Sequence, residues 1–92
     1  MIDYEVAYRR EMGAFVAQVI GFPEASAFAP TLGEARANLH AALRQAAESL
    51  LRRGAMLPIP GPAGGAADAY LVERVRVVPA GGDRVRITAG PT

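Results

Sequence analysis

The amino-acid sequence predicts an α+β fold in which one long helix packs on a mainly antiparallel sheet. Three observations support this class. Residues 2–9 alternate between apolar and polar side chains, which is typical of a half-buried strand. A capping sequence at Thr31 opens a long amphipathic helix pattern. Residues 70–78 and 84–88 are rich in β-branched side chains and are separated by glycines. The expected order is therefore β-β-β-α-β, with residues 84–88 as an additional last strand.

The N-terminal third of the chain predicts three strands. Residues 2–9 form the first, with their apolar side chains on one face. The second, residues 14–20, is apolar on both faces, so we expect it either in the middle of the sheet or covered on one face by another subunit. Residues 21–24 break the pattern, and residues 25–29 follow as a short third strand at an edge of the sheet.

One long helix is predicted after Thr31. The hydroxyl of Thr31 can accept a hydrogen bond from the backbone N–H of Glu34, and the Glu34 carboxylate can reach back to the N–H of Thr31. Gly54 is well placed to end the helix, because glycine adopts the left-handed conformation there without strain. His40 lies off the apolar face, so we expect it to be an exposed surface residue. The stripe that we expect to face the sheet consists of Leu32, Ala35, Leu39, Ala42, Leu43, Ala46 and Leu50.

The C-terminal hairpin carries a cluster of like charges. With a three-residue turn at 80–82, the apolar side chains of both strands share one face, and the other face holds Arg74, Arg76, Arg84 and Arg86. Like charges that lie opposite each other are destabilising, so a compensating group is expected. Asp3 and Glu5 supply it if the first strand lies beside residues 70–78. Otherwise the arginines contact an acidic partner or nucleic acid.

Composition narrows the range of functions. A chain of 92 residues is expected to form one small domain, over residues 1–90, without a large enclosed active site. It has no cysteine and a single histidine, so thiolate sites and paired-histidine zinc sites are excluded. No two carboxylates share a spacing that suggests an acid–base pair or a metal clamp. We therefore predict no enzymatic activity, no metal and no cofactor.

Charge and hydropathy bear on location and partners. The net charge of +1 gives no overall attraction for nucleic acid or for an anionic membrane. The first residues lack the pattern of a signal peptide, and no stretch is long and apolar enough to span a membrane. A cytoplasmic location is therefore expected.

An ordered set of short motifs runs through the middle of the chain. A glycine precedes a strand that contains aromatic, valine and alanine residues, and a Phe-Pro turn follows. A Thr-Leu sequence then opens the helix. The helix ends at a glycine, which is followed by an Ile-Pro sequence. In this sequence the motifs are Gly13-Ala14-Phe15-Val16-Ala17, Phe22-Pro23, Thr31-Leu32-Gly33-Glu34-Ala35, Gly54 and Pro58-Ile59-Pro60. This set resembles the N-terminal domain of the HicB-like antitoxin family.

The resemblance implies a truncated RNase H-like fold, with one helix on the sheet, the last strand beside the first, and no nuclease activity. Members of the family typically neutralise a small HicA-type toxin, an mRNA interferase, and form homo-oligomers. The implied function is thus an antitoxin-type protein-binding module with a small basic HicA-like toxin as partner, assembled as a dimer or tetramer. Binding is expected on the sheet, or at the turn and edge strand that contain Phe22, Pro23, Glu24, Ser26 and Phe28.

The sequence also departs from the family pattern. Glu24 stands where the family usually has glycine, and Ile20 stands where proline is common. The net charge is +1, whereas an inhibitor of a basic toxin is usually acidic. No helical DNA-binding segment follows the helix and hairpin, so direct DNA binding is not expected. These departures favour an alternative, a solitary HicB-like homo-oligomer that has no toxin partner and serves a structural role or binds a small ligand.

Overall fold

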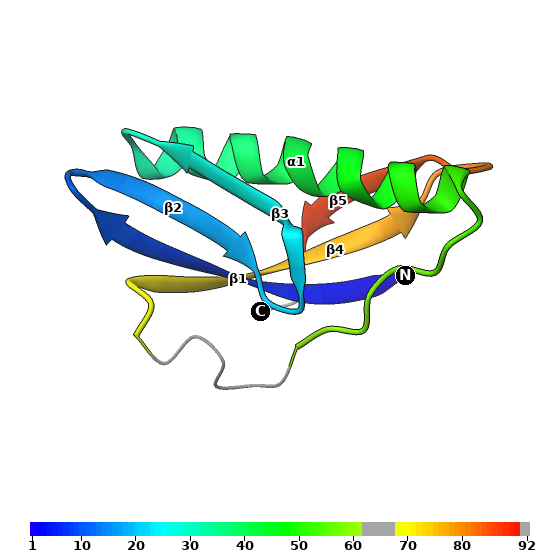
Figure 1. The fold of residues 1–92 in the computed structure, drawn as a ribbon, viewed down its shortest axis with the longest axis horizontal. Helices are drawn as coiled ribbons and strands as arrows, with labels where there is room; N and C mark the ends of the chain where they lie inside the picture. Colours follow the sequence, from blue (N-terminus) through cyan, green and yellow to red (C-terminus); the bar gives the residue numbers. More distant parts are fainter. Residues whose placement is uncertain (62–67, 91–92) are drawn as a thin grey trace.

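The protein is an α+β sandwich of one helix on one five-stranded sheet (Figure 1). The computed structural model describes residues 1–61 and 68–90. The elements in chain order are β1 (Ile2–Glu11), β2 (Ala14–Val19), β3 (Phe22–Ala29), α1 (Leu32–Arg52), β4 (Leu71–Pro79) and β5 (Val85–Ala89). The predicted class and order are confirmed, and the additional last strand is present.

The sheet has the strand order β3-β2-β1-β4-β5, and every neighbouring pair is antiparallel. β1 lies at the centre, where Val6 faces Val19 of β2 and Tyr4 faces Val75 of β4. The strand after the helix thus lies beside the first strand, as the resemblance implied. α1 covers one face of the curled sheet and packs mainly on β3, β2 and β5 (Figure 1).

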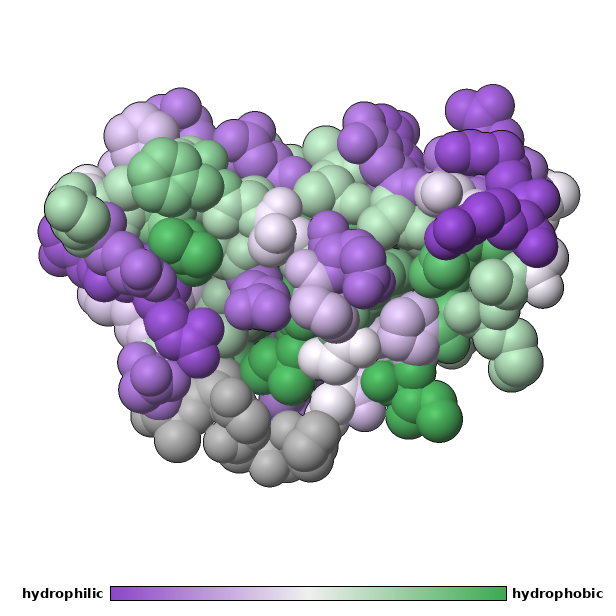
Figure 2. All heavy atoms as spheres, in the orientation of Figure 1, coloured by the Kyte–Doolittle hydropathy of each residue, from purple (hydrophilic) through white to green (hydrophobic). Residues whose placement is uncertain are grey.

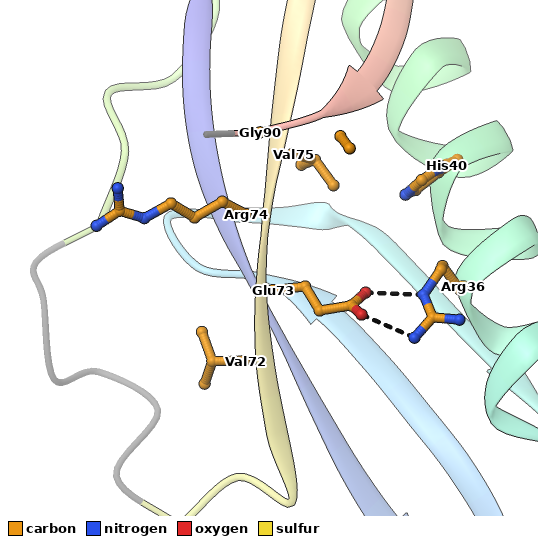
Figure 3. A pocket seen from close by; sticks show the side chains of 8 residues that line it. Arg36, His40, Val72, Glu73, Arg74, Val75 and Gly90 are labelled. Atoms are coloured by element: carbon orange, nitrogen blue, oxygen red, sulfur yellow. Dashed lines mark hydrogen bonds and ion pairs between the residues drawn. The ribbon is translucent and has the colours of Figure 1, made fainter. Parts of the chain in front are cut away.

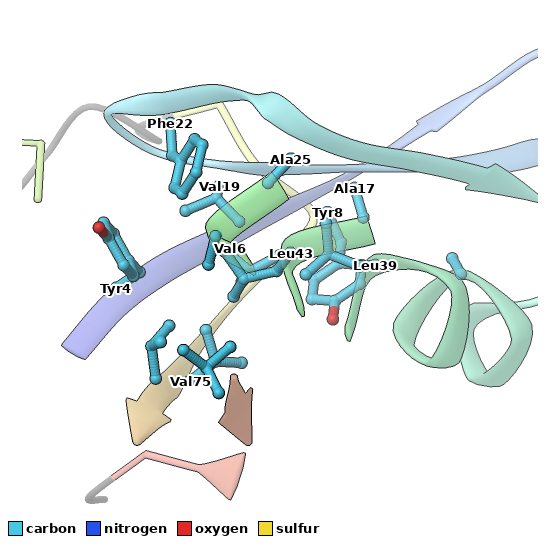
Figure 4. Close-up of a cluster of buried hydrophobic side chains, with 14 of the residues drawn as sticks. Tyr4, Val6, Tyr8, Ala17, Val19, Phe22, Ala25, Leu39, Leu43 and Val75 are labelled. Atoms are coloured by element: carbon cyan, nitrogen blue, oxygen red, sulfur yellow. The ribbon is translucent and has the colours of Figure 1, made fainter. Parts of the chain in front are cut away.

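The core fills the space between α1 and the sheet (Figure 4). The side chains of Tyr4 and Tyr8 are buried on this face of β1, and the helix buries Leu39 and Leu43 against them. The predicted helix stripe is correct at its centre. Ala42 and Ala46 are half-buried, however, and Ala47 is fully buried in their place. Fewer residues of the helix are therefore fully buried than predicted, and the last of them is Ala47.

Both ends of α1 follow from local capping chemistry. The Thr31 hydroxyl accepts from the N–H of Glu34 at 3.2 Å, as predicted. The return bond differs, because the hydroxyl also donates to the Glu34 carboxylate at 3.0 Å. At the other end, Gly54 has φ +72° and donates to the carbonyl of Leu51, while Ala55 donates to Leu50. This is a Schellman motif, so the predicted glycine exit is confirmed.

β3 begins earlier than the sequence predicted. Residues 21–24 were expected to interrupt the sheet, but the strand starts at Phe22, and the turn before it is centred on Gly21 with φ +86°. The pairing of β2 with β3 shifts register between Gln18 and Val19, so that Phe22 faces Val19. This irregularity accommodates a proline and a glutamate in the strand without breaking it.

The β4–β5 hairpin has a longer turn than predicted. Pro79 pairs with Val85, so the turn consists of the five residues 80–84, and Arg84 lies in it. The predicted turn of three residues and the observed turn of five both contain an odd number of residues. Each side chain of the hairpin therefore lies on the predicted face of the sheet. Val75 and Val77 therefore face the core with Val85.

In the part of the chain that the structure describes, no helix is long and apolar enough to cross a membrane. Within residues 1–61 and 68–90, no group of three or more histidine or acidic side chains is placed to hold a metal ion.

Candidate protein-binding surface

The edge strand β3 presents polar and aromatic side chains to solvent. Pro23, Glu24 and Ser26 are exposed, and Phe28 is 65% exposed. Ser26 and Phe28 lie opposite Gln18 and Val16 of β2, on the face of the sheet that α1 does not cover. An exposed phenylalanine on an edge strand is a usual sign of a contact surface, because large aromatic side chains are normally buried. β3 thus offers both an unpaired backbone edge and an aromatic anchor.

A groove of about 410 Å³ separates β3 from the C-terminal half of α1. Glu24 and Phe22 line its sheet side, and Ser49, Leu50 and Arg53 are among the residues on its helix side. The exposed Glu24 carboxylate stands at this groove, so β3 presents a negative charge next to apolar surface. Such a combination suits a partner with a basic and partly apolar surface.

Phe22 is part of the core. Its side chain is completely buried, and its ring packs against the ring of Tyr4 with 5.8 Å between centroids. It cannot offer its ring to a partner without unfolding this end of the sheet. Phe22 therefore supports the β2–β3 turn from inside, and the exposed candidates are Pro23, Glu24, Ser26 and Phe28.

The segment after the helix holds the β2–β3 turn in place. The Tyr4 hydroxyl donates to the carbonyl of Pro58 at 2.6 Å, and the N–H of Gly61 donates to the carbonyl of Ile20 at 3.2 Å. At Gly21 a Cβ atom would lie 2.5 Å from the backbone nitrogen of Gly61, so the two backbones touch. We call residues 57–61 the strap, because they cross the end of the sheet and fix the turn that leads into β3.

The arginine cluster is only partly compensated. Arg76 forms a two-pronged ion pair with Asp3, at 2.6 and 3.0 Å, as the sequence predicted. This contact lowers the pKa of Asp3 below its usual value, despite an opposing effect of burial. Glu5 lies opposite Arg74 in the register of β1 and β4, but the structure shows no ion pair between them. Arg86 and Arg84 are exposed.

Charges are distributed unevenly over the molecule. Figure 2 shows hydrophilic side chains at the end where α1 stops and the β4–β5 hairpin turns, and also at the opposite end of the molecule. The residues of this end include Arg52 and Arg53 of the helix terminus and Arg84 of the hairpin turn. The exposed carboxylate of Glu24 belongs to β3, at the opposite edge of the sheet. Arg53 also lines the groove beside Glu24, so that groove holds one charge of each sign, whereas the hairpin turn presents Arg84.

A second groove, which the sequence did not predict, lies between α1 and β4 (Figure 3). Arg36 of the helix reaches across it and donates to both carboxylate oxygens of Glu73, at 2.9 and 2.7 Å. The hydrogen bond from Arg36 lowers the pKa of Glu73. Tyr8 lies beneath this pair, and burial together with the charge of Glu73 raises its pKa to about 12. Among the described residues, the Tyr8 hydroxyl has no hydrogen bond of good geometry.

His40 lies in the same groove. It was expected to be exposed, but it is half-buried beside Arg36 and Glu73. Burial lowers the pKa of His40, because the interior disfavours the charged imidazolium. The i, i+4 spacing from Arg36 to His40 was the available signal. The sequence could not show that β4 lies opposite that helix face.

This geometry defines a class of domain: one helix on an antiparallel sheet of order β3-β2-β1-β4-β5, with the helix inserted between the third and fourth strands. The crystal structure of the N-terminal domain of the antitoxin HicB of Burkholderia pseudomallei has this fold. It superposes with a TM-score of 0.69, over 83% of this chain and 98% of that domain, at 17% sequence identity. The predicted resemblance is thus confirmed at the level of the fold. No family model matches the sequence, and no curated protein does.

Proposed function

We propose that this chain is an antitoxin-type protein-binding module that sequesters a small basic HicA-like toxin in the cytoplasm. One observation supports this most directly: the superposition covers 98% of the HicB N-terminal domain and 83% of this chain. The module acts by covering its partner and has no catalytic role of its own. The truncated RNase H-like fold that the sequence resemblance implied belongs to the same proposal.

The proposed toxin-binding surface is the exposed side of β3 with the groove beside it. Glu24 supplies a negative charge for a basic toxin, and Phe28 supplies an aromatic anchor. Ser26 adds hydrogen-bonding capacity between them. The strap holds the turn before β3 through Gly61, so this surface is ordered before binding and loses little entropy on association.

An RNA-cleavage assay tests the proposal. The probe is a purified HicA-type mRNA interferase, mixed with a labelled mRNA and increasing amounts of the purified chain. We expect cleavage to stop near equimolar chain. Glu24→Arg and Phe28→Ser should each weaken inhibition about tenfold or more, because they remove the charge complement and the anchor. Glu11→Arg is the matched control, since Glu11 is an exposed carboxylate at the far end of β1.

The alternative function is a solitary homo-oligomer, and the exposure of Phe28 on an open strand edge is the observation that favours it. Affinity capture of the tagged chain from its native lysate separates the two. A stoichiometric small basic protein supports the antitoxin. Unchanged RNA cleavage at a tenfold excess of chain, together with repeated recovery of the chain alone, would rule the antitoxin out and favour the homo-oligomer.

A further inference from the structure

Two adjoining depressions form one groove along the side of α1, at the edge of the sheet opposite β3. Their volumes are about 460 and 320 Å³, and His40 lines both. The helix wall contains Arg36, His40 and Arg44. The sheet wall contains residues 72–75 of β4 and residues of β5 with the glycine that follows it: Val85, Arg86, Ile87, Ala89 and Gly90. This is the β5 groove, and it does not overlap the proposed toxin surface on β3.

The helix wall is a row of cationic or titratable groups. Arg36, His40 and Arg44 are four residues apart, so they lie one above another over a length of about 12 Å. Arg36 is held by Glu73. Within residues 1–61 and 68–90, neither Arg44 nor Arg86, which also lines the groove, takes part in an ion pair. Arg86 lies on the face of β5 that points away from the core, so the two uncompensated guanidinium groups flank the strand edge on either side.

The sheet wall is an open strand edge. β5 pairs with β4 alone. The carbonyl of Arg84 and the N–H of Gly90 both bond to the neighbouring segment of β4, so even-numbered residues here point towards β4. Odd-numbered residues point the other way. Accordingly, the N–H of Val85 points outward, where the Glu48 carboxylate accepts from it at 3.0 Å.

The next two odd-numbered residues, Ile87 and Ala89, direct their N–H and C=O groups along the same open edge. In the described part of the chain these groups have no hydrogen-bond partner. The bond from Val85 to Glu48 shows that an N–H group on this edge donates to a carboxylate that lies close to arginines. The edge and the charges thus point to one kind of ligand, which has both a peptide backbone and carboxylates.

We propose that the β5 groove binds a short, extended, acidic segment of a partner protein. Its backbone pairs with Ile87 and Ala89 as an added strand, and its carboxylates meet Arg44 and Arg86. Nucleic acid would match the charges but not the strand edge. The lining residues also include no Phe, Tyr or Trp on which bases could stack, and the apolar ones are small or branched, such as Val75, Val85 and Ile87.

The test uses the full chain and a fluorescein-labelled hexapeptide of sequence Glu-Glu-Val-Glu-Glu-Val, which as a strand carries carboxylates on both faces. Fluorescence anisotropy should show saturable binding that weakens with salt. Arg44→Glu and Arg86→Glu should each weaken it roughly tenfold, because attraction becomes repulsion. Arg10→Glu is the matched control, since Arg10 is an exposed arginine near the β1–β2 turn. Arg44→Ala, expected to weaken binding a few-fold, replaces Arg44→Glu if circular dichroism shows that the latter is unfolded.

A second measurement isolates the strand edge from the charges. The same peptide, N-methylated at every residue, keeps its carboxylates but has no N–H group on either edge with which to pair as a strand, so we expect it to lose binding. In spectra of the ¹⁵N-labelled chain, the unmodified peptide should shift the amides of Ile87 and Ala89 and slow their exchange. Undiminished binding of the methylated peptide, an equal loss in Arg10→Glu, or tighter binding of a hexathymidylate than of the acidic peptide would each overturn the proposal.

Discussion

At the scale of single residues, Gly21 and Gly61 decide how the strap lies on the sheet. Gly21 has φ +86°, a conformation that other residues adopt only with strain, and its missing side chain leaves room for the backbone of Gly61. The hydrogen bond from Gly61 to Ile20 depends on that approach. Neither glycine forms part of a binding surface, yet both position the turn before β3.

Gly21→Ala should therefore destabilise the protein by about 1–3 kcal/mol, since it adds backbone strain and a collision. Urea unfolding followed by circular dichroism measures the effect. Gly33→Ala is the control, because Gly33 lies in the first turn of α1 with open space around its Cα and no positive φ. It should be neutral or stabilising by up to about 1 kcal/mol. Equal effects at the two glycines would contradict the role of the strap.

The Arg36–Glu73 ion pair makes the stability of the fold depend on pH in the acidic range. Because Arg36 lowers the pKa of Glu73 in the folded chain, the pair stabilises the fold above the unfolded pKa, near 4.5. That contribution is lost as the pH falls through the lower, folded pKa. Both side chains are partly exposed, at 39% and 29%, so its size is about 1 kcal/mol at pH 7.

Glu73→Gln should thus lower stability at pH 7 by about 1 kcal/mol and flatten its dependence on pH below about 4.5. Urea titrations between pH 2.5 and 7 measure both effects. Glu11→Gln serves as the control, since Glu11 is exposed and forms no ion pair within the described ranges. An unchanged slope in Glu73→Gln would show that the pair does not stabilise the fold.

At the scale of elements, α1 packs on the sheet mainly through a few buried leucines. Leu39 and Leu43 are completely buried against β1 and its neighbours. Leu39→Ala or Leu43→Ala should each cost about 2–5 kcal/mol, because each leaves a cavity in a packed core. Gln45→Ala, on the exposed side of the same helix turn, should change stability by less than about 0.5 kcal/mol. A loss below 1 kcal/mol at both leucines would mean that the helix is not anchored there.

Elements defined by neighbours in sequence were predictable, and elements defined by distant contacts were not. Thr31 and Gly54 set the ends of α1 through bonds within one helix turn, so local residue chemistry was sufficient to predict them. The start of β3 was missed because Phe22 is held in the sheet by its pairing with Val19 and its packing on Tyr4. Proline and glutamate at the next two positions signal a break when they are considered without those contacts.

The candidate sites show the same division. The exposed positions of β3 were proposed from the sequence, and their exposure in the structure keeps all except Phe22 as candidates. The β5 groove was not foreseen, although the spacing of Arg36, His40 and Arg44 was visible. Its other wall comes from β4 and β5, and no local pattern reveals that a helix and a strand edge will face each other.

At the scale of the whole molecule, the two edges of the sheet carry different chemistry. β3 presents a carboxylate and an aromatic ring, and β5 presents Arg86 beside Arg44 of the helix. The two edges therefore offer different chemistry to a binding partner. The net charge of +1 hides this difference, so overall charge is a poor guide to what either edge binds.

Phe28 distinguishes self-association from toxin binding. If copies of the chain pair along β3, sedimentation should show a dimer or tetramer, and Phe28→Arg should shift it to monomer without loss of stability, because the ring is already 65% exposed. Met12→Arg is the matched control, since Met12 is fully exposed in the β1–β2 turn. It should sediment like the natural chain. A natural chain that is monomeric at about 50 μM, well above a Kd of about 1 μM that corresponds to about −8 kcal/mol, would contradict self-association. If Phe28→Arg then also abolishes inhibition of the toxin, the exposed ring of β3 belongs to the toxin interface.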